Sequence, residues 1–220
     1  MKMLLNNCDN DLFFDNTYVN TIEILNKKAF YQMLKDINDL NNQDNITFIE
    51  DSEFTNMQSK VSIVYDYVNF DFDNKKVSSG VLSLVNSSID ENKKEEINKI
   101  YKKLCDFYRK IIGEFDLNIE IQEEFTLQDI SKLMKLTIVP RETLLNNLLL
   151  LLDLESEFHL NKLIVFINLK DYLENDELSE FYKYALYKNV SILLIDNTKH
   201  FTNNFEKKLL IDEDLVEFVL

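Results

Sequence analysis

The sequence predicts an α/β fold in which a helical segment interrupts a mostly parallel sheet. Near the end of the chain, two short apolar runs, Lys162–Asn168 and Val190–Asp196, flank a segment with helical spacing. An apolar strand, a helix and a second apolar strand form a parallel unit whose strands are covered on both faces. The first third of the chain has a strand–helix–strand–strand pattern, and the middle third is helical and rich in charge.

The elements of the first third follow from their spacing. Tyr18–Leu25 alternates as a strand does, and the apolar residues of Lys27–Leu40 recur at the spacing of an amphipathic helix. After an asparagine-rich turn, Ile46–Glu50 and Val61–Tyr67 are short runs typical of strands.

The middle of the chain predicts helices. Lys76–Glu114 carries one apolar stripe at helical spacing, and Leu117–Ile121 alternates like a strand or an extended segment. Thr126 is a suitable N-cap with Asp129 at the capping-box position. Pro140 suits the first turn of a further helix that continues to about residue 158.

These elements predict two domains. Residues 1–75 and 141–220 would form a discontinuous α/β head, and residues 76–140 an α-helical leg.

Composition excludes several classes of protein. Gly80 and Gly113 are the only glycines, and they are too far apart for either common phosphate-binding loop. Cys8 and Cys105 lack metal-site or redox spacing, which favours a reducing compartment. No signal peptide and no membrane-spanning run are visible, so we expect a cytoplasmic protein without a membrane partner.

Catalysis has little support in the sequence. His159 and His200 are the only histidines, and neither belongs to a local catalytic motif. Carboxylates could form a two-metal nuclease site, but no compact D-x-D or H-x-H element follows a strand. We therefore expect a protein that is not an enzyme.

One acidic segment is a candidate calcium site. Around a single bend it offers several oxygen ligands of the kind Ca²⁺ prefers, namely Glu120, Gln122, Glu123, Glu124 and Asp129. Alternation would point Glu120 and Gln122 to one side, and the following helix could return Asp129 towards them. The alternative is a solvated acidic turn before a helix N-terminus, where acidic residues are favoured.

A net charge of −15 argues against nucleic acid as a partner, but the distribution of the cations matters more than their sum. Lys132 and Lys135, three residues apart, would share a helix face, and Arg141 follows. These residues are candidate phosphate contacts. The alternative is ordinary solvated charge.

The segments KLIVFINLKDYL, VSILLID and LIDEDL resemble the type II-A CRISPR-associated adaptation proteins of the Csn-two family. The resemblance implies a head with the topology of P-loop ATPases but without the phosphate motif, and a helical leg. It also implies a homotetrameric ring that binds linear double-stranded DNA at its ends, and Ca²⁺ bound in the acidic segment. Gln122 stands where an aspartate is expected, or one residue is inserted.

The leading hypothesis is therefore a sequence-independent DNA-end-binding ring acting in spacer acquisition. The CRISPR integrase complex and the type II effector nuclease are the implied partners. Two alternatives remain. One is an acidic protein–protein scaffold with little DNA affinity, and the other is a nucleotide hydrolase, against which the missing glycine-rich loop argues.

Overall fold

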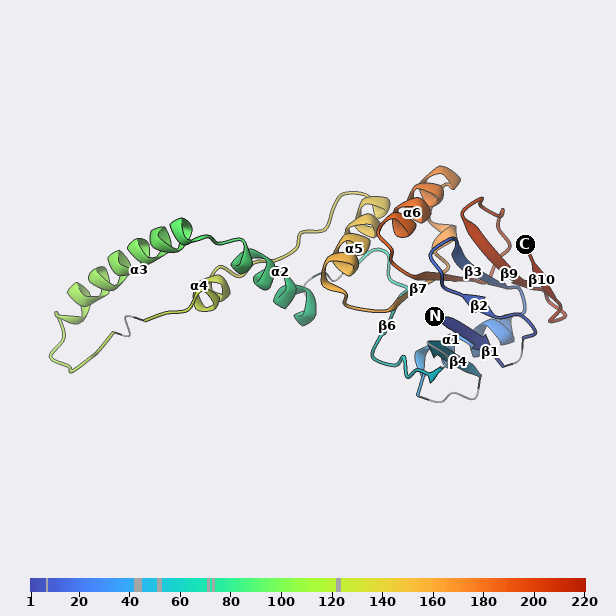
Figure 1. The fold of residues 1–220 in the computed structure, drawn as a ribbon, viewed down its shortest axis with the longest axis horizontal. Coiled ribbons are helices and arrows are strands. Elements are labelled where there is room, and N and C mark those ends of the chain that lie inside the picture. Colours follow the sequence, from blue (N-terminus) through green and yellow to red (C-terminus); the bar gives the residue numbers. More distant parts are fainter. Residues whose placement is uncertain (7, 42–44, 51–52, 71, 73, 122–123) are drawn as a thin grey trace. The chain divides into compact units, whose positions relative to one another are not determined.

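The computed structural model describes residues 1–6, 8–41, 45–50, 53–70, 72, 74–121 and 124–220 (Figure 1). The chain divides into two compact units. The first consists of Met1–Asp71 and Pro140–Leu220, and the second of Phe72–Val139. Among the described residues, no helix is both long and apolar enough to cross a membrane.

A six-stranded sheet of order β10-β9-β3-β8-β7-β6 forms the centre of the first unit. β3 pairs in parallel with β8 and β9, and β7 pairs in parallel with β6 and β8. Within this sheet, only β10 is antiparallel to its neighbour, β9. The mostly parallel α/β sheet predicted from the sequence is thus confirmed. Its strands are β3 (Val19–Ile24), β6 (Val61–Val64), β7 (Leu163–Ile167), β8 (Ile192–Asp196), β9 (Glu206–Ile211) and β10 (Glu217–Val219).

Helices cover both faces of this sheet. α1 (Lys27–Asn38) packs on one face, where Ile22, Val165 and Ile195 belong to one buried cluster. α5 (Leu144–Phe158) and α6 (Asn175–Tyr187) pack on the other face (Figure 1). Their buried side chains form one cluster with Phe166 and Leu194. Because β7 and β8 are buried along their whole length, they read as continuous apolar runs. The short 3₁₀ helix η1 (Leu169–Asp171) follows β7.

A second, four-stranded antiparallel sheet was not predicted. Its order is β2-β1-β4-β5, with bounds Lys2–Leu5 (β1), Leu12–Phe13 (β2), Ile46–Glu50 (β4) and Glu53–Phe54 (β5). Met3, Leu5, Ile46 and Phe48 join the same buried cluster as α1. The strand at Ile46–Glu50 is confirmed, but it belongs to this sheet rather than to the parallel one. Two-residue strands carry too little pattern to be recognised in a sequence.

The second unit is helical. α2 (Lys75–Ser87) and α3 (Glu91–Ile112) replace the single helical segment expected over residues 76–114. The break lies at Asp90, whose side chain caps α3 by accepting a hydrogen bond from the Lys93 amide at 2.9 Å. α4 (Leu127–Leu133) begins after the predicted cap. Thr126 and Asp129 form the expected capping box.

Of the two alternatives predicted for Leu117–Ile121, a strand or an extended segment, the structure shows no strand. One local prediction was wrong. Pro140 does not begin a helix, since α5 starts at Leu144 after the N-cap Thr143. The Thr143 hydroxyl accepts the Asn146 amide at 3.2 Å, and this cap sets the start of the helix later than the proline.

Candidate functional site

The carboxyl ends of the parallel strands are where α/β sheets of this kind bind ligands. In nucleotide-binding proteins of the P-loop type, a glycine-rich loop joins a parallel strand to the helix that follows it. Here β3 ends at Ile24 and α1 begins at Lys27. The Asn26 side chain caps the helix by accepting hydrogen bonds from the amides of Lys28 and Ala29, each at 3.1 Å. The connection is too short for a phosphate loop, and the chain itself occupies the helix N-terminus.

A network of buried ion pairs lies on one face of the sheet, across β3 and β9. The Lys170 ammonium lies 3.2 Å from Glu23 Oε1 and 2.9 Å from Glu206 Oε2. Lys208 lies 2.8 Å from the same Glu23 oxygen and donates to the His200 carbonyl at 2.7 Å. The Tyr182 hydroxyl donates to Glu206 at 2.9 Å. Burial, together with the charge of Glu206, raises the pKa of Tyr182 well above its usual value, so the phenol stays protonated.

A threonine and a histidine in the loop after β8 lie close to an aspartate at the end of η1. Thr198 Oγ1 is 2.8 Å from His200 Nε2 and 3.2 Å from Asp171 Oδ1, and the same Asp171 oxygen is 3.4 Å from His200 Nε2. A catalytic relay requires the hydroxyl and the acid on different ring nitrogens. Both groups lie at Nε2 here, so the geometry is not that of an activated nucleophile. Burial also lowers the pKa of His200.

The candidate DNA-binding residues divide between the two units. Lys132 lies in α4 and Lys135 just beyond it, both in the second unit, whereas Arg141 lies in the first. All three side chains are exposed, and none has an ion-pair partner among the residues that the structure describes. The backbone of Arg141 is held by Asn147, whose amide side chain accepts from its N–H at 2.7 Å and donates to its carbonyl at 2.9 Å.

One part of that prediction was wrong. Lys132 and Lys135 do not share a helix face, because α4 ends at Leu133 and Lys135 has a left-handed φ of 47°. The helix itself is anchored by Ser131, whose hydroxyl donates to Asn86 of α2 at 2.6 Å. Because Ser131 is buried and its neighbour Lys132 is exposed, the contact directs the lysine towards solvent.

Only part of the predicted calcium segment can be placed. Glu120 and Glu124 are exposed, whereas Gln122 and Glu123 lie outside the described residues. The carboxylate of Asp129 is engaged by Thr126, accepting its hydroxyl at 2.6 Å and its amide at 3.0 Å. These hydrogen bonds, the hydroxyl first, lower the pKa of Asp129. Within the described ranges, no three His, Cys, Asp or Glu side chains form a group suited to a metal ion.

An exposed apolar row runs along α3. Ile100, Leu104, Phe107, Tyr108 and Ile111 are between 36% and 67% exposed. Their spacing of four, three, one and three residues places them on one side of the helix. The adjacent side packs within the unit, where the rings of Tyr101 and Phe125 lie 4.2 Å apart. An exposed apolar row of this kind is typical of a contact surface.

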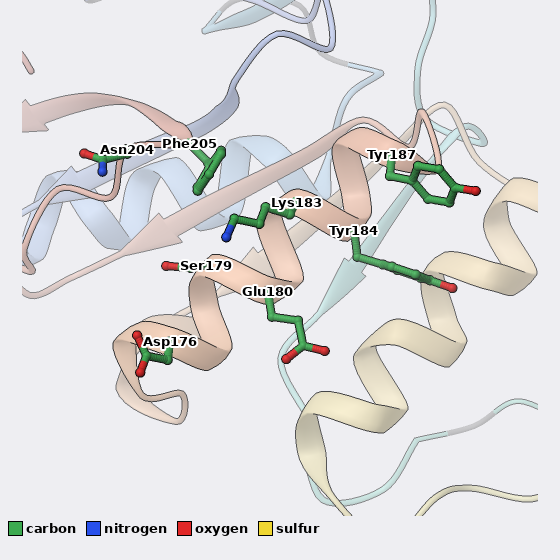
Figure 2. A pocket seen from close by; sticks show the side chains of 8 residues that line it. All are labelled: Asp176, Ser179, Glu180, Lys183, Tyr184, Tyr187, Asn204 and Phe205. Carbon is green, nitrogen blue, oxygen red and sulfur yellow. The ribbon is translucent and has the colours of Figure 1, made fainter.

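The exposed side of α6 forms a shallow pocket of about 730 Å³, shown in Figure 2. Its floor is held in place, because Tyr184 donates to Asp153 at 2.7 Å and Ser179 accepts from Asn203 at 2.7 Å. Lys183 lies over the Phe205 ring at 4.9 Å. The remaining charged residues of the lining are Asp176 and Glu180, so this surface repels phosphate.

Residues 39–215 match the family described as CRISPR-associated protein Csn2. The chain belongs to the Csn2 family. This confirms the resemblance seen in the sequence and assigns the protein to CRISPR adaptation. The fold is also similar to the crystal structure of Stu0660 of Streptococcus thermophilus, with a TM-score of 0.59 and 12% identity over 96% of this chain and 75% of that one. No curated protein matches the sequence significantly.

The buried ion-pair network of this Csn2 protein was not predicted from the sequence. Its charges stand inside apolar segments, at Glu23 in the strand VNTIEI and at Lys208 in EKKLLI. A charged residue at every second position of a strand normally indicates a solvent-exposed face. The signal that could have found the network is the pairing of opposite charges between strands, which becomes visible only once β3 is known to lie beside β9.

Proposed function

We propose that this Csn2 protein is a non-enzymatic ring that binds the ends of linear double-stranded DNA during spacer acquisition, without regard to sequence. Membership of the family carries the proposal. Lys132 and Lys135 support it locally, because they are exposed and have no ion-pair partner among the described residues, and counterion release requires cations that are free to approach phosphates. A ring repeats each weak basic patch in every subunit, so modest local charge is sufficient to hold a duplex.

The exposed apolar row on α3 supports self-assembly. Five large side chains between 36% and 67% exposed are costly to leave in water. A second copy of the chain supplies an equally apolar row, and pairing of two such helices excludes water from both. We propose that this contact contributes to a homotetramer.

Calcium is the proposed cofactor, held by oxygen ligands of the acidic segment. Support comes from Glu120 and Glu124, which are exposed and have no hydrogen-bond or ion-pair partner within the described part of the chain. The Phe125 ring packs at a tilt of 41° against Tyr101, which holds the end of the acidic segment against α3. A bound cation in this place would brace the segment and so the geometry of the assembly.

The absence of enzyme activity is also part of the proposal. It is supported by the short, self-capped connection between β3 and α1 and by the convergence of Thr198 and Asp171 on one nitrogen of His200. A protein that holds DNA ends without cutting them must deliver them to others. We propose the integrase complex and the type II effector nuclease as those partners.

The second candidate function is a protein–protein scaffold with little DNA affinity. The pocket on α6 favours it, because Asp176 and Glu180 stand beside Tyr184 and Tyr187 on a surface unsuited to phosphate. The net charge of −15 points in the same direction.

Duplex binding at several salt concentrations separates the two candidates. Lys132→Glu with Lys135→Glu should weaken binding of linear duplex equally for unrelated sequences, and each lost phosphate contact should lower the salt slope by roughly one. The control is Lys27→Glu with Lys28→Glu, which makes the same charge change at two exposed lysines of α1.

Closed circular DNA of the same sequence tests the mode of loading. A ring loads from an end, so circles should bind poorly. If the Lys132/Lys135 variant and the Lys27/Lys28 control lose the same affinity for linear duplex, the loss is due to net charge rather than to contacts at Lys132 and Lys135. Tight binding of circles would replace the ring with an open basic surface.

A further inference from the structure

Two carboxylates lie side by side, fully buried, in the centre of the sheet. Glu23 of β3 and Asp196 of β8 are paired in register on neighbouring parallel strands, and each is 0% exposed. Residues so paired point to the same face of a sheet. Glu23 Oε1 is engaged by two lysines. Among the described residues, Glu23 Oε2 and both oxygens of Asp196 accept no hydrogen bond of good geometry, although the backbone N–H of Lys170 lies close enough to Asp196 to favour its charged form. Buried polar atoms without partners are rare, and each requires a physical explanation.

The charges of this region do not balance. Glu23, Asp196 and Glu206 carry three negative charges when ionised, and Lys170 and Lys208 carry two positive ones, so one negative charge remains uncompensated among side chains at most 5% exposed. An unpaired buried charge is strongly unfavourable. A single positive charge removes the excess. A divalent cation would overcompensate it, and no suitable group of three metal-binding side chains occurs within the described residues.

We infer that Glu23 and Asp196 form a buried binding site for one proton, which Asp196 carries and donates to Glu23 Oε2. Binding converts the Asp196 carboxylate into a carboxylic acid whose O–H becomes a donor. The new hydrogen bond satisfies Glu23 Oε2 and uses one of the two idle oxygens of Asp196. It also brings the charge of the cluster to zero.

The surroundings of Asp196 agree with a proton held near neutral pH. Burial raises the pKa of Asp196 to about 7, the positive charge of Lys170 opposes this rise, and the negative charge of Glu23 adds to it. The titratable groups that interact with Asp196 come from several neighbouring elements: Glu23 on β3, Lys170 and Asp171 on η1, Tyr182 on α6, and Tyr67 after β6. Glu206, Lys208 and His200 complete the cluster through their interactions with Lys170 and Glu23.

The loop that joins β8 to β9 begins directly after Asp196 and is held at two points. The Asn197 amide donates to Asn168 Oδ1 at 3.0 Å, and the His200 carbonyl accepts from Lys208 at 2.7 Å. Loss of the proton leaves an excess charge beneath this loop, and opening of the loop would admit water to solvate it. The loop is therefore the element whose stability responds to the proton.

Asp196→Asn tests the inference, because the amide keeps the shape of the protonated acid and can donate to Glu23 Oε2. The acid holds its proton more tightly in the folded state, so the wild-type folding constant should fall by up to tenfold per pH unit between about pH 4 and pH 7. Urea unfolding of Asp196→Asn should lack this fall. Asp176→Asn, the same exchange at an exposed position, should retain it.

Two further measurements do not depend on the variant folding. Carboxyl ¹³C shifts of the wild-type protein should show Asp196 titrating near pH 7. Protection of the Asn197 amide from hydrogen exchange should fall as this group ionises. Titration of Asp196 near pH 4 would overturn the inference. So would stability that follows K⁺ or Na⁺ concentration at constant pH and ionic strength, because the bound charge would then be a metal cation.

Discussion

Replacing Lys170 by methionine tests whether the buried ion pairs hold the first unit together. The Lys170 side chain is 1% exposed and bridges Glu23 and Glu206, at 3.2 Å and 2.9 Å. Methionine is close to lysine in length and flexibility, so the substitution removes the charge while leaving little cavity. In the variant, the buried carboxylates of Glu23 and Glu206 share one ammonium group, that of Lys208.

The expected cost follows from the partners that are left. Breaking a buried ion pair by removing one partner costs about 3–5 kcal/mol. Lys208 still lies 2.8 Å from Glu23 and 3.7 Å from Glu206, so we expect the lower end of that range. With a urea dependence of about 2 kcal/mol per molar, a loss of about 3 kcal/mol lowers the unfolding midpoint by about 1.5 M.

The measurement is urea unfolding followed by circular dichroism, with Lys162→Met as the control. Lys162 pairs with Glu50 on the surface, with side chains 41% and 34% exposed, and such pairs contribute less than about 1 kcal/mol. Combining Lys170→Met with Glu206→Gln should recover part of the loss, because one of the stranded charges disappears. If Lys170→Met lowers the midpoint no further than Lys162→Met does, the network does not stabilise the fold.

Three further predictions concern assembly, calcium and helix capping. Leu104→Glu with Phe107→Glu on α3 should lower the oligomer mass measured by light scattering in calcium. The control, Lys99→Glu with Lys103→Glu on the same helix, should leave the mass unchanged. If the Leu104/Phe107 variant keeps the wild-type mass, α3 is not part of the interface. Calcium at a hundredfold excess over Kd should stabilise the wild-type protein by about 3 kcal/mol, and Glu120→Ala with Glu123→Ala should weaken that effect; a wild-type melting temperature indifferent to calcium would show that there is no site. Asn26→Ala should lower the free energy of unfolding in urea by about 1 kcal/mol, because the cap on α1 is lost. Asn26→Asp retains an acceptor and should lower it less. Equal losses in the two variants would assign the effect to the hydrogen bond that Asn26 donates to the Glu213 carbonyl.

Most local elements of this Csn2 protein could be predicted from the sequence, because short-range physics decides them. The 3.6-residue spacing of apolar side chains identifies α1 and α3, and the continuous apolar runs identify β7 and β8. The capping box of Thr126 and Asp129 was also predicted correctly. The start of α5 was not, because Pro140 and Thr143 are both acceptable starting residues and the hydroxyl cap prevails.

The candidate site was less accessible to sequence reasoning. The exposure of Lys132 and Lys135 agrees with a role in phosphate contact, but the turn at Lys135 could not be foreseen in a residue type that rarely adopts positive φ. The buried charges of Glu23, Lys170 and Asp196 are far apart in the chain and carry no motif.

The sequence by itself determined the α/β class, the family and the places where most helices and buried strands occur, since these depend on neighbouring residues and on recognisable segments. Only the tertiary structure decided that β3, from the first third of the chain, lies between β8 and β9 from the last. The pairing of distant strands depends on the packing of whole faces, which local pattern does not encode. The same packing brings Glu23 and Asp196 together out of water, where two ordinary carboxylates acquire the electrostatics of a proton site.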